Sequence, residues 1–286
     1  MRFRKPKLSR VVALCIVWLA VLIAVFPLYW LLVTSFKSPR EIFSIDPSFI
    51  PQEPTLRNYR VIIEGYDPGR GLQVPLLAQF RNSIVVALVT SFGGVIVATA
   101  GAYTLVRSGL AWLRWIFLAI LLMRTVPRVT IAIPLYLLLQ RLDLLDSIPG
   151  LVLTHLTVVI PLSTFLMVSF MQDLPEELEE AAFVDGASKL QAFGNIVLPL
   201  ITPGLAVTAI FAFILSYNEF LYSIILISSP SARTLPVALS LYIQQYGIVW
   251  ELLSAAGSLA TLPVIVFAFV LQRFIVRGLS MGALKG

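Results

Sequence analysis

Six long apolar runs constrain this chain more than any other feature. They lie near Val11–Ser35, Ile84–Val106, Trp115–Leu139, Leu151–Phe170, Gly204–Ile227 and Ala255–Phe274. A bilayer core about 30 Å thick takes about 20 apolar residues per helix, and in lipid a helix satisfies its own backbone polar groups. Charged residues make up 13% of the chain, against about 25% in a typical soluble domain. The sequence therefore predicts an all-α polytopic membrane protein with six transmembrane helices.

The basic residues predict how the chain is oriented. Five lysines and arginines and no acid lie in Met1–Arg10, directly before the first run. Because positive charges near a span end stay cytoplasmic, both termini, the Arg107–Arg114 link and the segment Met171–Thr202 are expected in the cytoplasm. Three loops are then external, namely Phe36–Asn82, Gln140–Gly150 and Ser228–Glu251. Anionic lipids at the span ends explain the net charge of +6, so no nucleic acid partner is expected.

The polar segment Met171–Thr202 is predicted to form two short helices. Asp173, followed by Pro175, has the pattern of an N-cap and first turn, and Gly186 is a natural helix stop. Helical spacing places Leu178, Ala181 and Ala182 on one side, where small residues allow a partner to approach. The second helix is expected to end at Pro199.

This segment is also strongly acidic. Its six acidic residues against Lys189 give a net charge of about −5, which favours a partner with a basic rim. From the residues alone, an ordinary solvated amphipathic helix explains the pattern equally well.

The spacing of the segment resembles a family signature. Glu180-Ala181-Ala182, Gly186 and Ile196-Val197-Leu198-Pro199 are similar to the EAA signature of ABC-transporter permeases. The resemblance implies that this loop seats in a separate ATPase and couples it to the membrane helices. The residues implied in coupling are Glu180, Ala181, Ala182, Asp185, Gly186, Ile196, Leu198 and Pro199.

Further motifs extend the resemblance over nearly the whole chain. Ser35-Phe36-Lys37, Asn82-Ser83, Asn218-Glu219-Phe220 and Leu262-Pro263 resemble the second, maltose-type permease subunit of carbohydrate ABC importers. The resemblance implies the type I ABC importer permease fold, in the inner membrane of a prokaryote. It implies residues 1–78 as tail, first helix and external loop, 79–275 as the core with a coupling loop at 171–202, and 276–286 as a cytoplasmic tail.

The same resemblance implies the partners. They are a second permease in a heterodimer, two copies of a cytoplasmic ATPase that hold the ATP and Mg, and an external solute-binding protein. Two other functions stay open from the sequence. One is an ABC permease for a non-sugar solute, and the other is a gradient-driven transporter, which would predict paired intramembrane acids and inverted repeats that the sequence does not show.

Charged and polar residues inside the apolar runs are possible pore residues. Arg124 and Arg128 lie four apart around Pro127, so a continuous helix would place them on one side, facing the translocation path. The alternative is structural pairing with Glu219, lipid headgroups or the partner permease. Asn218 and Glu219 form a polar notch near the middle of the fifth run, either at the pore or in a hydrogen bond between helices.

The external loop Ser228–Glu251 contains a polar and aromatic group, Gln244, Gln245 and Tyr246. The resemblance implies contact with the docked binding protein, and a plain connecting loop is the alternative.

Several functions are disfavoured by missing motifs. The sequence has no Gly-x-x-x-x-Gly-Lys-Ser/Thr phosphate loop, no metal-ligand spacing and no soluble segment large enough for a catalytic domain. We therefore expect no cofactor, no metal site and no enzymatic activity in this chain. His155, alone on an apolar helix, is expected to pack or to form a local hydrogen bond, and Cys15 has no cysteine partner.

Overall fold

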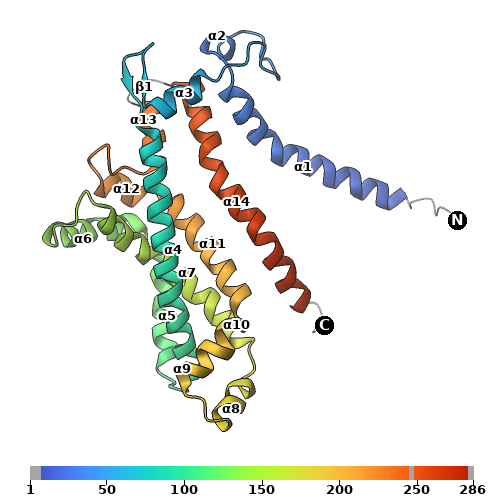
Figure 1. Ribbon diagram of the computed structural model, residues 1–286, viewed down its shortest axis with the longest axis vertical. Helices are drawn as coiled ribbons and strands as arrows, with labels where there is room; N and C mark the ends of the chain where they lie inside the picture. The colour runs from blue at the N-terminus through green and yellow to red at the C-terminus, as the bar shows by residue number, and fades with distance from the viewer. Residues whose placement is uncertain (1–7, 245–247, 283–286) are drawn as a thin grey trace. The chain divides into compact units, whose positions relative to one another are not determined.

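The computed structural model describes residues 8–244 and 248–282, and these residues are mostly helical (Figure 1). The first half contains α1 (Leu8–Ser35), α2 (Pro39–Ile42), α3 (Arg57–Glu64), β1 (Tyr66–Asp67), β2 (Leu72–Gln73), α4 (Leu76–Arg107), α5 (Leu113–Leu122), η1 (Met123–Thr125) and α6 (Arg128–Arg141). The second half contains α7 (Ile148–Gln172), α8 (Glu177–Val184), α9 (Lys189–Ala192), η2 (Phe193–Val197), α10 (Leu198–Leu200), α11 (Thr202–Tyr217), α12 (Leu221–Leu226), α13 (Leu235–Gln244) and α14 (Trp250–Gly282).

These elements form two compact units. The first contains the described residues of Met1–Leu76 together with Leu239–Leu262, and the second contains those of Leu77–Ala238 and Pro263–Gly286. Helix α14 therefore contributes to both units.

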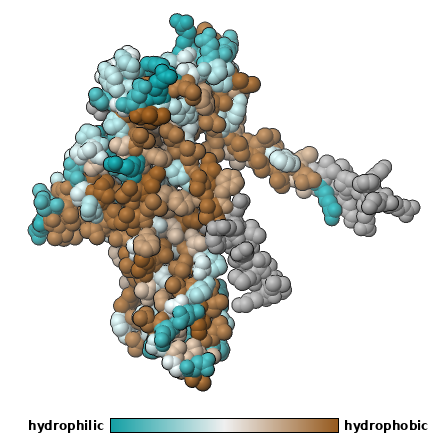
Figure 2. All heavy atoms as spheres, viewed as in Figure 1, coloured by the Kyte–Doolittle hydropathy of each residue, from teal (hydrophilic) through white to brown (hydrophobic). Residues whose placement is uncertain are grey.

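In the first unit, α1 is an apolar helix that is exposed over most of its length. An 18-residue apolar window within Val12–Ser35 is 0% buried, and hydrophobic residues predominate along it in Figure 2. Only its end is covered, because Val33, Thr34 and Ser35 are buried. The amide of Asn58 donates to the carbonyls of Ser35 (2.8 Å) and Lys37 (3.1 Å), which fastens α3 to the end of α1. An antiparallel hairpin of β1 and β2, absent from the sequence prediction, follows α3.

The first unit contains a network of ion pairs around two buried acids, Asp67 and Glu251. Asp67, 1% exposed, receives hydrogen bonds from Arg57 (2.8 Å) and Arg70 (2.9 Å). Arg70 also pairs with Glu251 at the start of α14, 181 positions further along the chain. Burial disfavours the charge on Asp67, but the bonds from Arg70 and the Gly69 backbone, with the positive charges of Arg57 and Arg70, outweigh burial and lower its pKa.

In the second unit, α4, α7 and α11 pack closely where side chains are small. A Cβ atom on Gly94 would lie 2.7 Å from Val159, and one on Gly204 would lie 2.4 Å from the ring of Phe170. Both glycines therefore allow one helix backbone to approach its neighbour. Ser91 adds a hydrogen bond from α4 to the carbonyl of Ala209 in α11 (3.1 Å).

The described residues contain four helices long and apolar enough to cross a membrane, or up to six if each of two bent helix pairs is one span. The upper number agrees with the six predicted spans, and the chain is a multi-pass membrane protein. The third predicted span, however, is not a continuous helix, because α5 with η1 meets α6 at 102°. Val126 before Pro127 is extended (ψ 126°), since proline disfavours helical geometry in the residue before it.

The fifth predicted span is also interrupted. Helix α11 ends at Tyr217, Asn218 caps it, and α12 begins at Leu221. Asn218 and Glu219 therefore lie in a break between two helices, not in the middle of one.

Candidate functional site

The loop between α7 and α11 carries the residues that the sequence singled out, and its first helix begins differently from the prediction. Asp173 is the C-cap of α7, and α8 has Glu176 as its N-cap without a side-chain hydrogen bond. The predicted capping role of Asp173 is therefore wrong. Three acids in the first turn of α8, Glu177, Glu179 and Glu180, lie near the positive end of the helix dipole.

The predicted end of α8 is confirmed. Asp185 is the C-cap and Gly186 has φ +88°, a left-handed conformation that glycine adopts without strain. The N–H of Gly186 donates to the carbonyl of Phe183 (3.1 Å), and that of Ala187 donates to Ala182 (2.9 Å). These two bonds form a Schellman motif, which satisfies the last carbonyls of the helix.

The second short helix ends one residue beyond its predicted end. It begins at Ser188, whose side chain forms a capping box with Gln191, and continues through the π-helical turn η2 into α10. Pro199 is the middle residue of α10, which ends at Leu200. The chain then bends by 74° into α11.

The loop has one side buried in its own chain and one side exposed. Glu179 is 4% exposed and Ala182 is 9% exposed, whereas Val184 is 88% exposed and Leu190 is 80% exposed. The predicted grouping of Leu178, Ala181 and Ala182 on one open side is therefore wrong. Leu178 and Ala181 are exposed, but Ala182 faces inward, because it lies three residues after the buried Glu179.

The other predicted loop residues also lie at or near the surface. Glu180, Asp185, Gly186, Leu198 and Pro199 are exposed, and Ile196 is half-buried.

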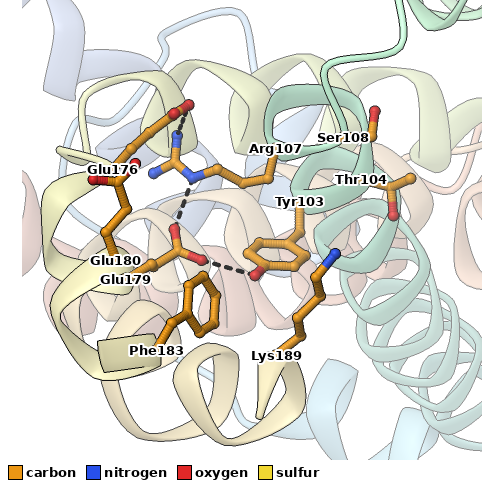
Figure 3. A pocket seen from close by; sticks show the side chains of 9 residues that line it. All are labelled: Tyr103, Thr104, Arg107, Ser108, Glu176, Glu179, Glu180, Phe183 and Lys189. Atoms are coloured by element: carbon orange, nitrogen blue, oxygen red, sulfur yellow. Dashed lines mark hydrogen bonds and ion pairs between the residues drawn. The ribbon is translucent and has the colours of Figure 1, made fainter. Parts of the chain in front are cut away.

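The buried side of α8 meets the end of α4 in an ionic network (Figure 3). Arg107 Nε donates to Glu179 Oε1 (2.7 Å), and the Tyr103 hydroxyl donates to Glu179 Oε2 (2.7 Å). Arg107 also reaches Glu176 Oε1 (3.2 Å) and the carbonyl of Leu174 (2.8 Å). The Tyr103 ring packs edge-on against Phe193 of η2, with centroids 4.8 Å apart.

This network borders a cavity of about 400 Å³ with charges of both signs. Its lining comprises Tyr103, Thr104, Arg107, Ser108, Glu176, Glu179, Glu180, Phe183 and Lys189. In the sequence, Arg107 stands out only as a positive charge beside a span, and Glu179 only as one acid of an acidic segment. The local signal was the spacing of four between Tyr103 and Arg107, which puts both on one face at the end of a span.

The polar residues of the membrane helices form a second cluster around Glu219. This side chain is 2% exposed, and its Oε2 accepts hydrogen bonds from the backbone N–H groups of Tyr222 (3.0 Å) and Ser223 (3.3 Å). Arg128 Nη1 lies 3.9 Å from Oε1, and His155 Nε2 lies 3.5 Å from Oε2. The carboxylate thus accepts backbone hydrogen bonds at the start of α12 and lies beside Arg128 of α6 and His155 of α7.

The other predicted pore residues are not brought together with this cluster. Arg124 lies in η1, before the 102° bend, so it does not share a helix side with Arg128 as predicted. Asn218 is exposed, and its amide donates to the carbonyl of Ile214 (2.9 Å). His155, expected to pack or to form a local hydrogen bond, is buried in α7 and shares a hydrogen bond between its Nδ1 and Ser216 Oγ of α11 (2.8 Å).

The predicted contact residues for the binding protein lie at the edge of the described structure. Gln244 is the last residue of α13. Gln245 and Tyr246 lie outside the described residues, as do the basic residues before Leu8 and the end of the tail after Gly282.

Comparisons with known proteins agree on one family. Residues 91–281 match the family described as binding-protein-dependent transport system inner membrane component. The trehalose/maltose transport system permease protein MalG of Thermococcus litoralis is 31% identical over 99% of both chains. The sulfoquinovosyl glycerol transport system permease protein SmoH of Agrobacterium fabrum is 33% identical, over 91% of this chain and 90% of its own.

A solved structure shows the same fold. It is the crystal structure of a bacterial ABC transporter involved in the import of the acidic polysaccharide alginate. One of its chains matches with a TM-score of 0.75 at 20% identity, over 96% of this chain and 98% of that chain.

Proposed function

Because this chain belongs to the family of binding-protein-dependent transport system inner membrane components, we propose that it is a permease subunit of an ATP-driven importer of a carbohydrate or sugar-like solute. It is a membrane permease and not an enzyme. Two relatives are named for transport of trehalose/maltose and of sulfoquinovosyl glycerol, which supports a sugar-like solute. The chain forms half of the pore, and a second permease forms the other half. An external binding protein delivers the solute.

The observation that carries the coupling role is the exposed side of the α8–α10 loop. Val184 and Leu190 expose 88% and 80% of their surface, and Glu180 and Asp185 lie exposed nearby. Large apolar side chains exposed to this extent beside charged residues suit a protein interaction site. We assign this side to a cytoplasmic ATPase, two copies of which hold the ATP and Mg. The coupling residues are Glu180, Ala181, Asp185, Gly186, Ile196, Leu198 and Pro199, with Ala182 supporting them from the inner side.

A membrane partner has a surface available as well. An apolar groove of about 690 Å³ lies between α4 and α11 and includes Phe92, Ile96 and Ala206 in its lining. Apolar helix surfaces with small residues suit packing against another membrane helix. This groove supports the proposed second permease.

For the polar cluster, the geometry favours the structural alternative over direct solute contact. Glu219 is buried, accepts two backbone hydrogen bonds and lies within 4 Å of Arg128 and His155. Glu219 therefore has a structural role at the start of α12, while Arg124, Arg128 and Asn218 are exposed and remain the candidate pore residues. Gln244, with Gln245 and Tyr246, is proposed to face the binding protein.

Co-purification tests the coupling role. A Val184→Asp and Leu190→Asp double variant, expressed with the second permease and the ATPase, is expected to lose the ATPase while the two permeases still co-purify. Leu110→Asp is the matched control, since Leu110 is 52% exposed on the predicted cytoplasmic link between α4 and α5. Retention of the ATPase by the double variant contradicts the assignment.

Ligand binding by the partner protein tests the solute class. The cognate external protein is titrated with maltose, trehalose, an alginate oligosaccharide, proline and spermidine, and thermal stabilisation is measured. Stabilisation by a saccharide supports the proposal. Stabilisation by proline or spermidine alone favours an importer of a non-sugar solute.

A further inference from the structure

The buried and exposed sides of α8 point to two separate tasks. Val184 on the exposed side is available to a partner, whereas Glu179 on the buried side is committed to α4. A movement of the exposed side can reach the membrane helices only through the contacts and covalent connections between the loop and those helices.

The covalent connections of the loop are bent or interrupted. Towards the C-terminus, α10 meets α11 at 74°. Towards the N-terminus, Leu174 and Pro175 separate α7 from α8, and α7 itself contains Pro161. A helix break or an internal proline interrupts the ladder of backbone hydrogen bonds, so neither connection is a continuous hydrogen-bonded helix.

Arg107 supplies a third connection, and it joins the loop to an uninterrupted helix. Its guanidinium contacts Glu179, Glu176 and the carbonyl of Leu174, which are three separate points of the loop. The planar fork of arginine fixes direction as well as distance at each point. Helix α4 runs for 32 residues without a proline inside it, ending at Arg107.

Tyr103 completes the connection from the same helix face. Its hydroxyl holds the second carboxylate oxygen of Glu179, so both oxygens are bonded to α4 (Figure 3). The buried carboxylate is thereby fully paired, and removal of Arg107 leaves a buried charge with one neutral partner.

We propose that Arg107 and Glu179 are positioning residues that join the coupling loop rigidly to the end of α4, so that displacement of α8 by the ATPase moves α4 with it. The inference rests on the proposed coupling function. It separates the residues that transmit the movement from the exposed residues that bind the ATPase.

Distance measurement between two spin labels tests the rigid connection. The labels are placed at Leu110→Cys, just after α4, and Asn195→Cys, exposed in η2, in a Cys15→Ser background. The complete assembly in nanodiscs is measured without nucleotide and after trapping with ATP and vanadate. The otherwise unaltered chain is expected to show one narrow separation that is the same in both states.

In the Arg107→Gln variant, the distribution of distances between the two labels is expected to become broad, while the ATPase still co-purifies. Arg114→Gln is the matched control, because Arg114 lies on the same predicted cytoplasmic side and faces Trp115. It is expected to keep the separation. If Arg107→Gln does not assemble, Tyr103→Phe is measured in its place. This variant lacks only the hydroxyl group, and it is expected to broaden the distribution of label distances.

Three results overturn the inference. They are a separation that changes between nucleotide states in the unaltered chain, an unchanged separation in the assembled Arg107→Gln or Tyr103→Phe variant, and loss of the ATPase from an assembled Arg107→Gln variant. Failure of the coupling function itself gives a different result, since the unaltered chain then retains no ATPase. The label separation in the permease alone still tests the connection in that case.

Discussion

At the scale of single residues, Glu219 is the side chain on which most of the intramembrane polar structure depends. Its carboxylate accepts two backbone N–H groups and faces Arg128 and His155. We expect Glu219→Ala to destabilise the chain by about 3 kcal/mol, because it leaves buried donors without an acceptor. Arg128→Gln should cost less, since the Arg128 side chain is 46% exposed and 3.9 Å from the carboxylate.

Unfolding in mixed micelles, followed by circular dichroism, measures both changes. Arg124→Gln is the control, because Arg124 lies exposed beyond the bend. An Arg128→Gln variant that is less stable than Glu219→Ala would contradict this account of the cluster.

Gly186 provides a second residue-scale prediction, because its backbone requires a left-handed conformation. Gly186→Ala should destabilise the end of α8 by about 1 kcal/mol, through backbone strain alone. A Cβ atom added at Gly186 or at Gly101 would meet no other atom within 4 Å, and of these two glycines Gly186 alone has a positive φ. Gly101→Ala in α4 is therefore the matched control, expected to be neutral or stabilising in the same unfolding measurement.

At the scale of elements, the contact of α7 with α11 depends on the absence of a side chain at Gly204. Gly204→Ala should destabilise the chain by about 2 kcal/mol, because the added methyl group would lie 2.4 Å from the Phe170 ring. A Phe170→Leu change in the same chain should recover part of this loss. Equal unfolding midpoints for the original chain and Gly204→Ala would show that the helices do not approach this closely.

Asp67 of the hairpin forms an element-scale contact that depends on pH, because it binds Arg57 of α3 and Arg70 of the hairpin turn. The pKa of Asp67 is lowered on folding, so the stabilisation is fully present above its ordinary value of 3.8. It is lost as the pH falls through the lower pKa of the folded state. Asp67→Asn should remove about 2 kcal/mol at neutral pH, because charged hydrogen bonds from two arginines are lost.

Unfolding midpoints measured from pH 7 to pH 3 test this contact. The original chain should lose stability below pH 3.8 more steeply than Asp67→Asn. Parallel pH profiles for the two chains would exclude Asp67 as the responsible group.

At the scale of the whole molecule, the predicted orientation places the loop before α3 and the loop containing α8 on opposite sides of the membrane. Ile45 is 98% exposed in the predicted external loop, and Val184 is 88% exposed in the predicted cytoplasmic loop. In a Cys15→Ser background, a membrane-impermeant maleimide should label Ile45→Cys in intact cells and Val184→Cys only after permeabilisation. The reverse pattern would place both termini outside.

The sequence by itself determined the class of protein, the number of apolar runs and the local signals of the coupling loop. Apolar length and the Gly186 helix stop are local properties, so they can be read without knowing which helices meet. The acidic segment was recognised as a whole, but its inner and outer sides were assigned wrongly at Ala182. Helical spacing shows which residues share a side without showing which side is buried.

Only the tertiary structure decided the pairings that hold the site in place. Arg107 meets Glu179 across 72 positions, and Arg70 meets Glu251 across 181. Because the helices are broken at Pro127 and Asn218, Arg124 and Arg128 do not share a helix side, and Glu219 lies within 4 Å of Arg128 and His155. Such contacts depend on the directions in which neighbouring helices pack, and those directions are set by close approach at positions such as Gly94 and Gly204, not by local hydrophobic period.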